Sequence, residues 1–415
     1  MSSERPDELV VVLDAPELGP RRPVGVLRRR AGPRPVLSFE YARTWREGPA
    51  LAIFDPSLPL VEGEQFVGGD LLPGILSDTA PDRWGRRLLE RREASTARHE
   101  GRAPRRLQEW DFLTGVDDRT RMGALRLAMT PDGPFASEHH SPIPPQTRLP
   151  TLEVAARRAD DPATPGPTDA EVAMLLAPGS SLGGARPKAN FADPNGHLWI
   201  AKFPSTIDRR DIGAWEYLLA TLARRAGIAV ADSERLTLSP TGSTFAARRF
   251  DRVGSERRLY ASAMTLTGKR DGEDASYLDI AFAIADHGDP EVIAQDLEQL
   301  FRRVVFNVLV GNRDDHLRNH GFLCGPGGWR LAPAFDVNPS PDTPDHALAI
   351  DDNSHEPDLG IVLATAPFYR VPKPSAEQLI REVKSVTDTW RSEARRFAFP
   401  ADEINLVGTA FVSSQ

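Results

Sequence analysis

The sequence is poor in cysteine and has no long apolar run. Cys324 is the one cysteine among 415 residues, which excludes an intrachain disulfide framework and a cysteine metal cluster. No apolar stretch approaches the roughly 20 residues that span a bilayer, and the polar N-terminus lacks the apolar core of a signal peptide. We therefore expect a cytoplasmic protein that does not use a membrane.

An excess of positive charge is also missing. Lys and Arg number 51 against 59 Asp and Glu, and the formal net charge of −8 argues against general electrostatic binding to nucleic acid. The segment from Arg83 to Arg106 differs, because it holds nine arginines and only Glu90, Glu93 and Glu100 among them. Such a segment is typical of a solvated helix face with many ion pairs. The alternative is a contact surface for a partner, or for DNA that a partner brings.

The periodicity of the apolar residues predicts an α/β protein whose parts differ in character. The first part alternates like short strands, and the second is rich in Pro, Ser, Thr and Asp like a linker. The third mixes strands and helices, and the fourth is mostly helical. The predicted bounds are a strand-rich N-terminal subdomain at 1–115, a linker at 116–170, a mixed α/β lobe at 171–260 and a helical C-terminal lobe at 261–415.

Within these parts, several elements can be predicted from local patterns. Four stretches predict short antiparallel strands: "LVVVLD", "PVGVLRR", "PVLSFEYA" and "ALAIFDPSLPL". A helical stretch follows at "DLLPGILSDTAPDRWGRRLLERRE", for which Ser77 or Asp78 is the expected N-terminal cap. A short helix is expected at 151–159, inside the linker. The pattern after Asp211 predicts an amphipathic helix that ends at Gly227.

A lysine and a glutamate stand in an order that suits phosphate binding. Lys202 lies in the apolar strand "LWIAKFPS", and alternation places it on the face of Leu198 and Ile200. A lysine on such a face either meets an anion, such as a phosphate, or extends to water at the strand end. Glu216 follows on a predicted helix, where a kinase glutamate would orient that lysine. Taken alone, Glu216 is a solvent-facing residue.

A glycine-rich turn, "SSLGGARPK", precedes that strand. Gly183 and Gly184 would let backbone amides approach an anion with no Cβ in the way. The turn is not a Walker A motif, because no Gly-Lys-Ser/Thr follows at the required spacing. It suits a phosphate contact or an ordinary tight turn.

The stretch "VLVGNRDDHLRNHGFL" changes from apolar to polar at Gly311. Asp314 and Asn319 have the Asp-x-x-x-x-Asn spacing of a kinase catalytic loop. A carboxylate can accept the proton of an attacking hydroxyl there, and an amide oxygen can ligate Mg²⁺. Asp336 follows in "WRLAPAFDV", at the expected end of an apolar strand, where a second metal carboxylate belongs. Lys202, Glu216 and these three residues together favour phosphoryl transfer.

A competing interpretation uses His316 and His320. On a helix their spacing would place both imidazoles on one face, where they could bind zinc with Asp314 or Asp315. This would predict a metallohydrolase. The intervening residues lack the general-base glutamate of the His-Glu-x-x-His motif.

The sequence resembles the HipA-type serine/threonine kinases, the toxins of bacterial toxin–antitoxin pairs. The resemblance rests on "SSLGGARPK", "WIAKFPS", "FAARRFDR", "GNRDDHLRN" and "LAPAFDV", and on "GILSDTAPDRWGRRLL" nearer the N-terminus. These motifs occur in the family's order over most of the chain. The resemblance implies a two-lobed, protein-kinase-like α/β fold, with a strand-rich N-terminal part and a helical C-terminal lobe.

The matching positions imply catalytic and regulatory roles. Asp314 resembles the catalytic base, and Asn319 and Asp336 resemble the Mg²⁺ ligands. Ser181 falls where family members have a serine whose autophosphorylation switches the enzyme off. Ser180 is adjacent and is the alternative acceptor.

Other matching positions imply nucleotide binding. Lys202 resembles the lysine that holds the phosphates, and Gly183 and Gly184 lie in the loop that covers them. Arg248 and Phe250 belong to the segment that holds the adenine through backbone groups. Arg248 stands where some members have a glutamate, so the sequence departs from the family pattern there.

The resemblance also implies cofactors and partners. ATP and Mg²⁺ are the expected cofactors, and a helix-turn-helix antitoxin is the expected partner, through which alone the protein would meet DNA. The expected substrate is a translation component such as an aminoacyl-tRNA synthetase. A catalytically degenerate kinase fold that acts only as a co-repressor is the alternative; the intact set of Lys202, Asp314, Asn319 and Asp336 argues against it.

Overall fold

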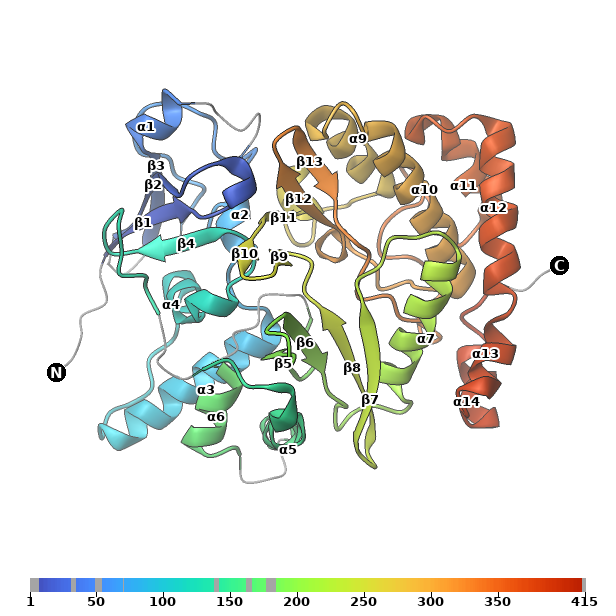
Figure 1. Cartoon of the computed structure of the whole chain (residues 1–415), viewed down its shortest axis with the longest axis horizontal. Helices are drawn as coiled ribbons and strands as arrows, with labels where there is room; N and C mark the ends of the chain where they lie inside the picture. The colour runs from blue at the N-terminus through green and yellow to red at the C-terminus, as the bar shows by residue number, and fades with distance from the viewer. Residues whose placement is uncertain are drawn as a thin grey trace. The chain divides into compact units, whose positions relative to one another are not determined.

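The computed structural model describes residues 7–30, 35–48, 54–69, 71–137, 142–161, 166–176 and 184–412. The chain forms two compact units (Figure 1). The first consists of Met1–Ile207 and Asp251–Ala261, and the second of Asp208–Phe250 and Ser262–Gln415. Within the described residues, none of the helices has both the length and the apolarity that crossing a membrane requires.

The first unit begins with an antiparallel sheet of four strands in the order β3-β2-β1-β4. Leu9 and Val11 are fully buried and alternate with the more exposed Glu8 and Val10, as the strand repeat requires. The strands are β1 (Glu8–Leu13), β2 (Arg22–Arg30), β3 (Val36–Tyr41) and β4 (Leu125–Ala128), with the short helices η1 (Pro16–Leu18) and α1 (Arg43–Arg46) between them.

Three of the four predicted strands are β1, β2 and β3. The fourth stretch forms turns over 54–60, and its remaining residues lie outside the described ranges. Asp55 explains the difference, because its carboxylate accepts hydrogen bonds from the backbone N–H groups of Ser57 and Ile75, both at 2.8 Å. An aspartate that binds nearby N–H groups favours a turn over a strand.

Two helices, not one, follow the first three strands: α2 (Gly74–Ser77) and α3 (Arg83–His99). The predicted cap at Ser77 or Asp78 is wrong, because Asp82 caps α3 and accepts a hydrogen bond from Gly85 N–H at 2.8 Å. Pro81 explains the break between the two helices, since the residue before a proline disfavours the helical conformation.

The rest of the first unit combines short helices with hairpins. The linker predicted at 116–170 contains β4 and, near the expected short helix, α5. The elements are α4 (Glu109–Gly115), η2 (Asp118–Thr120), η3 (Gln146–Arg148), α5 (Leu149–Asp160), α6 (Asp169–Leu176), the antiparallel pair β5 (Lys188–Ala192) and β6 (Leu198–Lys202), the short pair β9 (Arg252–Val253) and β10 (Glu256–Arg257), and β11 (Leu259–Ser262).

The second unit is mainly helical, as the sequence predicts for the end of the chain. It contains two antiparallel hairpins, β7 (Ser233–Ser239) with β8 (Gly242–Arg248), and β12 (Gly321–Gly325) with β13 (Gly328–Leu331). Its helices are α7 (Ile212–Arg225), α8 (Ala263–Leu266), α9 (Tyr277–His287), α10 (Ile293–Val310), η4 (Leu317–Asn319), α11 (Leu359–Thr365), η5 (Ala366–Tyr369), α12 (Lys373–Thr387), α13 (Trp390–Arg396) and α14 (Ala401–Val407).

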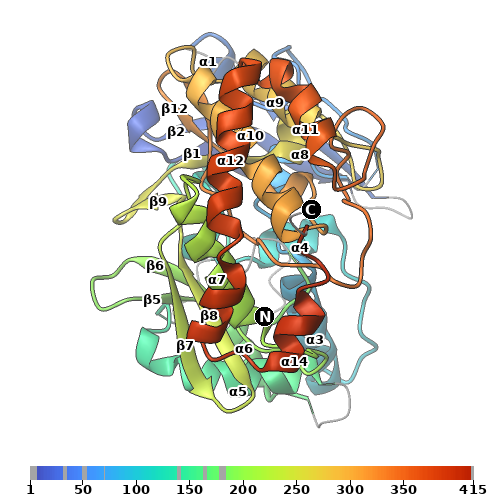
Figure 2. The same ribbon diagram turned by 90° about the vertical axis from the view of Figure 1, so that its right-hand side faces the viewer.

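Helix α10 is the central element of the second unit. The helices α9, α11 and α12 pack against it, and Figure 2 shows α12 running along it. Every residue from Arg303 to Val310 is buried, as in a helix surrounded by protein on all sides. Each such apolar side chain contributes about 2 kcal/mol of burial free energy. The loop that follows α10 therefore starts from a rigid core.

Candidate functional site

The loop after α10 begins with a turn that requires glycine. Gly311 has a φ of 65°, and a Cβ at this position would lie 2.2 Å from the carbonyl oxygen of Ala410. Only a residue without a side chain fits that conformation and that space. The left-handed turn ends the helix and leads the chain into the polar loop Asn312–His320.

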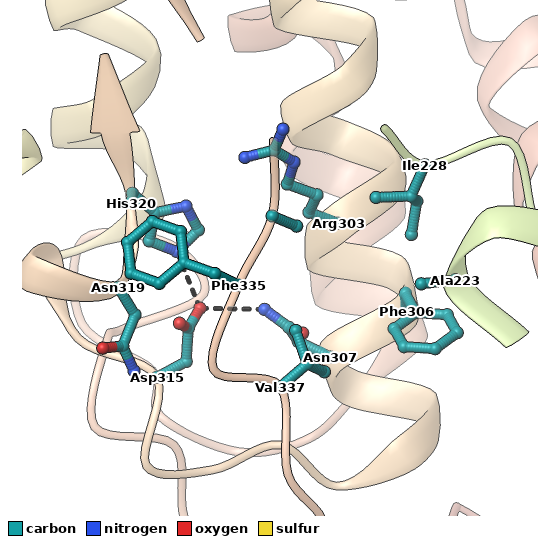
Figure 3. A pocket seen from close by; sticks show the side chains of 11 residues that line it. Ala223, Ile228, Arg303, Phe306, Asn307, Asp315, Asn319, His320, Phe335 and Val337 are labelled. Atoms are coloured by element: carbon teal, nitrogen blue, oxygen red, sulfur yellow. Dashed lines mark hydrogen bonds and ion pairs between the residues drawn. The ribbon is translucent and has the colours of Figure 1, made fainter. Parts of the chain in front are cut away.

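Asp315 anchors this loop in the core (Figure 3). Its Oδ2 atom accepts hydrogen bonds from Tyr277 Oη at 2.7 Å, from Asn307 Nδ2 at 2.8 Å and from His320 Nε2 at 2.8 Å. Since a carboxylate can only accept, Nε2 of His320 carries the proton. The three donors come from α9, from α10 and from the residue after η4, so one carboxylate ties three segments together.

The same contacts keep Asp315 charged. Burial alone would raise the pKa of this carboxyl group, but the imidazole of His320, the hydroxyl of Tyr277 and the charge of His316 together lower it. Tyr277 shows the complementary effect: burial and the neighbouring Asp315 charge raise the pKa of its phenol. The pair therefore stays a carboxylate and a neutral phenol at physiological pH.

Asp314 and Asn319 lie on the outer and inner sides of the same loop. Asp314 is exposed, whereas Asn319 is buried. Asn319 Nδ2 donates to the carbonyl oxygen of Asp314 at 3.2 Å, across the turn of η4. Asn319 Oδ1 is buried and has no hydrogen-bond partner among the described residues. The predicted base and the predicted amide ligand are thus adjacent, and the amide oxygen is available to a ligand.

Asp336 adopts a backbone conformation that is rare for a side-chain-bearing residue. Its φ is 58°, which costs about 1–3 kcal/mol and persists only where the surroundings hold it. The strand predicted to end at Asp336 ends at Leu331 instead, so Asp336 lies in the loop beyond β13. Strain of this kind is frequent at functional sites.

Two residues fasten the Asp336 loop to the loop Asn312–His320. Asn312 Oδ1 accepts from the backbone N–H of Asn338 at 3.1 Å, and its Nδ2 donates to Asn307 Oδ1 at 3.1 Å. Arg313 donates to the carbonyl oxygens of Ser340 and Thr343. The two loops that carry Asp314, Asn319 and Asp336 are therefore held together by side-chain contacts.

A pocket of the second unit lies against these loops (Figure 3). Polar atoms of Asp315, Asn319 and His320 face apolar residues from α7, α10 and the loop of Asp336. The lining residues are Ala223, Ile228, Arg303, Phe306, Asn307, Asp315, Asn319, His320, Ala334, Phe335 and Val337. Both neighbours of Asp336 line this pocket together with Asn319.

The predicted adenine-holding segment reaches the same wall. Phe250 packs against Phe335 with ring centroids 5.5 Å apart, and Phe335 directly precedes Asp336. The backbone N–H of Arg248 donates to the carbonyl oxygen of Asp232 at 2.8 Å. Glu216 is 3% exposed, which differs from a solvent-facing helix residue.

The remaining predicted nucleotide residues belong to the first unit. Lys202 ends β6 and is half-buried, and its register partner on β5 is Lys188. Gly184 has a φ of 97°, which favours glycine. Gly183, Ser180 and Ser181 lie outside the described residues.

The helix face that the zinc interpretation requires does not form. His316 and His320 flank the 3₁₀ turn η4, and His320 is bound to Asp315. In the part of the chain that the structure describes, no three His, Cys, Asp or Glu side chains are placed to hold a metal ion.

Several residues of this site escaped the sequence patterns. Tyr277 and Asn312 carry no motif that points to the loop. Asn307 offered a signal, since it is an amide inside the apolar run "VVFNVLV", and a buried polar side chain needs a partner. That signal indicates a polar contact but not which residue makes it.

Comparisons with known proteins identify the family. The model of the HipA N-terminal domain matches residues 19–127, and that of the HipA-like C-terminal domain matches residues 180–390. No curated protein matches the chain by sequence.

Solved structures resemble the chain as well. One is that of the Shewanella oneidensis MR-1 toxin–antitoxin system, a complex of HipA, HipB and operator DNA. The match has a TM-score of 0.66 and 17% identity, and covers 97% of this chain and 94% of that chain. The Helicobacter pylori proinflammatory kinase CtkA matches with a TM-score of 0.34 and 17% identity, over 51% of this chain and 95% of that chain.

The likeness to the Shewanella structure confirms the predicted fold class, a mixed α/β protein with a strand-rich N-terminal part and a helical C-terminal part. The two family models follow one another along the sequence, and the C-terminal one alone spans residues 180–390. The chain is therefore a member of the HipA family.

Proposed function

We propose that this HipA-family protein is a kinase that transfers the γ-phosphoryl group of ATP, with Mg²⁺, to serine or threonine hydroxyls of a protein. One observation carries the proposal. Asn319 Oδ1 is buried and lacks a hydrogen-bond partner among the described residues, on a pocket that both neighbours of Asp336 also line. A buried acceptor left without a donor costs about 1–3 kcal/mol, and a bound cation would remove that cost.

The donors at this position fit Mg²⁺. This ion prefers oxygen ligands, and proteins supply it with one or two carboxylates beside the phosphates of the substrate. Asn319 Oδ1 and the carboxylate of Asp336 would hold the ion. When bound, it would neutralise negative charge on the transferred phosphoryl group.

Asp314 would orient the substrate hydroxyl and accept its proton. Its exposure suits a protein substrate, whose serine or threonine must reach it from solvent. The buried contacts of Asp315 and Asn319 fix the loop on both sides of this residue. Catalysis would thus come mainly from positioning and charge neutralisation.

Nucleotide binding would use two groups of residues, one for the adenine and one for the phosphates. Phe250 and its neighbours would hold the adenine, and Lys202, with the glycine-rich loop of Gly183 and Gly184, would hold the phosphates. The packing of Phe250 against Phe335 supports this assignment, because it brings the adenine-holding segment to the residue before Asp336.

The proposed partner and substrate are those that family membership favours. The similar Shewanella structure is a complex with HipB and operator DNA, and we propose that this chain likewise pairs with a DNA-binding antitoxin. As its target we propose a translation component such as an aminoacyl-tRNA synthetase. Phosphorylation of Ser181 by the enzyme itself would switch it off, since the added charge would repel the ATP phosphates.

The test compares wild-type protein with Asp314→Asn. After incubation with ATP and Mg²⁺, mass spectrometry should find phosphate on Ser181 or Ser180 in the wild type, and at least about 100-fold less in the variant, as expected for a lost general base. Asp271→Asn is the matched control, since Asp271 is an exposed aspartate of the same unit that pairs with Arg318. Near-wild-type phosphorylation by folded Asp314→Asn would exclude the assigned base. If the wild type neither modifies itself nor phosphorylates candidate proteins, the kinase proposal is wrong, and the alternative of a catalytically degenerate co-repressor remains.

A further inference from the structure

A buried ion pair joins the helix α3 to the strand that follows the glycine-rich loop. Lys188, the first residue of β5, is 1% exposed. Its Nζ atom lies 2.7 Å from Oδ2 of Asp82, whose side chain is 5% exposed. A lysine is almost never fully buried unless it is paired. The ion pair with Asp82 therefore helps to hold Lys188 in its buried position.

The turn that begins α3 holds Lys188 through both its side chain and its backbone. Asp82 Oδ1 accepts from Gly85 N–H, while Oδ2 receives the ammonium group. Two residues on, the fully buried indole of Trp84 donates its Nε1–H to the carbonyl oxygen of Lys188 at 3.0 Å. One short segment, Asp82–Trp84, therefore holds the start of β5 through two contacts, an ion pair and a hydrogen bond to the backbone.

This anchoring reaches the glycine-rich loop directly. The Nζ atom of Lys188 also lies 3.5 Å from the carbonyl oxygen of Gly184, and a Cβ at Gly184 would meet that Nζ at 3.4 Å. Lys188 thus directly follows the described end of the loop, Gly184–Pro187, and its Nζ atom also contacts the first residue of that segment.

The ion pair between Asp82 and Lys188 also affects the electrostatic environment of Lys202. Lys188 and Lys202 are directly opposite in the antiparallel β5–β6 ladder, where like charges destabilise the pairing. The carboxylate of Asp82 beside Lys188 offsets this repulsion between the two strands.

We infer that Asp82 and Trp84 are positioning residues for Gly184–Pro187, the described end of the glycine-rich loop, so that the N-terminal family domain sets the phosphate affinity of the C-terminal one. Asp82 and Trp84 fall within the match to the N-terminal domain, and Lys188 within the match to the C-terminal domain. That this loop binds phosphate rests on the proposed function. The anchoring of the loop itself does not depend on it.

The decisive variant is Asp82→Asn, which keeps a good helix cap but removes the negative charge beside Lys188. We expect its affinity for ATP to fall about tenfold, the equivalent of one charge-assisted hydrogen bond, while its affinity for adenosine stays within about twofold. A purely structural defect would not separate the two ligands. Asp82→Glu, which keeps the charge, should restore most of the ATP affinity.

Hydrogen exchange in the nucleotide-free protein gives a second readout. Amides of Gly184–Ala192 should exchange faster in Asp82→Asn than in the wild type, and those of α10 should not. Trp84→Phe removes the hydrogen bond to Lys188, together with part of the buried ring, and should act in the same direction. It also provides the test if Asp82→Asn does not fold. Asp55→Asn is the matched control, because Asp55 is a buried aspartate of the same unit that accepts from the N–H of Ile75.

The two hypotheses can fail separately. If the wild type binds neither ATP nor adenosine, the proposed function is wrong, and hydrogen exchange still decides whether Asp82 anchors the loop. If the wild type binds ATP and folded Asp82→Asn binds it equally well, the positioning role is overturned. Equal loss of ATP and adenosine affinity, with unchanged exchange at Gly184–Ala192, would also overturn it.

Discussion

At the scale of single residues, the second unit buries charged groups and satisfies them with hydrogen bonds. Asp315 receives donors from three segments. Arg303 is fully buried, and its burial lowers the pKa of its guanidinium to about 10, while one of its nitrogens donates to Ala332 O at 2.6 Å. Desolvation offsets much of the free energy that such contacts provide. Their consequence is geometric, since each allows one arrangement of the loops around Asp314.

His346 is a buried group of the opposite kind, because its two ring nitrogens have no hydrogen-bond partner in the described part of the chain. Burial lowers the pKa of its imidazole from 6.5 to about 4. As the pH falls, His346 therefore binds a proton near pH 6.5 in the unfolded chain, but only near pH 4 in the folded protein. The contribution of His346 to stability is complete above pH 6.5 and is lost as the pH falls towards 4.

We expect this residue to lower the free energy of unfolding by about 2 kcal/mol between pH 7 and pH 5. His346→Leu should remove most of that decrease, because leucine fills the space and does not titrate. Urea unfolding of both proteins at the two pH values measures it. Equal pH dependence in the two proteins would show that another group is responsible.

The sequence predicts some of these residues and not others. Asp314, Asn319 and Asp336 could be predicted because spacing and order along the chain express their chemistry. The partners of Asp315 could not, since Tyr277, Asn307 and His320 come from segments that no local pattern relates. The strained backbone of Asp336 depends on how its loop is fastened to Asn312, which is a property of the folded unit.

At the scale of elements, the ends of helices and strands decide where the functional side chains lie. Helix α10 ends at Gly311, whose left-handed conformation and contact with Ala410 exclude a Cβ. Helix α3 begins at Asp82 because Pro81 interrupts the preceding helical stretch. Local patterns predicted a helical stretch where α3 lies, but they could not rank Asp82 above Ser77 and Asp78 as its cap.

Gly311→Ala should therefore be more harmful than an alanine at another glycine of the same backbone conformation. Gly272 has a φ of 85° and open space around its Cβ position, so Gly272→Ala should cost only about 1–2 kcal/mol of left-handed strain. Gly311→Ala adds a clash with backbone and should cost at least about 3 kcal/mol in total. Denaturant unfolding compares them; equal losses would mean that the chain near Ala410 simply moves aside.

At the scale of the whole molecule, the two family domains do not coincide with the two compact units. Residues Asp251–Ala261 lie in the C-terminal family match but belong to the first unit. Asp251 is fully buried and accepts from Gly123 N–H at 2.8 Å, and Arg252 donates to Arg121 O at 2.7 Å. The N-terminal domain thus holds the segment directly after Phe250. Contacts between residues so far apart in sequence leave no trace in local periodicity.

The arginine-rich segment also has a definite arrangement. Arg86 pairs with Glu109 at 2.6 Å, Arg102 with Glu93 at 2.6 Å, and Arg105 with Asp111 at 2.8 Å. Part of the positive charge of α3 and the following loop is therefore neutralised within the first unit. Of the described arginines in this segment, Arg83, Arg91, Arg98 and Arg106 form no ion pair, and Arg91 donates instead to the carbonyl oxygen of Ala159.

The isolated protein should accordingly bind duplex DNA only weakly. Few cations remain to displace counterions from phosphates, and the net charge of −8 opposes approach. At ~150 mM salt, where charges are screened beyond roughly 8 Å, we expect a Kd of about 10⁻⁴ M or weaker, independent of sequence. Fluorescence anisotropy measures this, and Arg98→Gln should change it little, because one exposed arginine supplies at most one phosphate contact. Submicromolar, sequence-specific binding by the protein alone would contradict the view that it meets DNA through a partner.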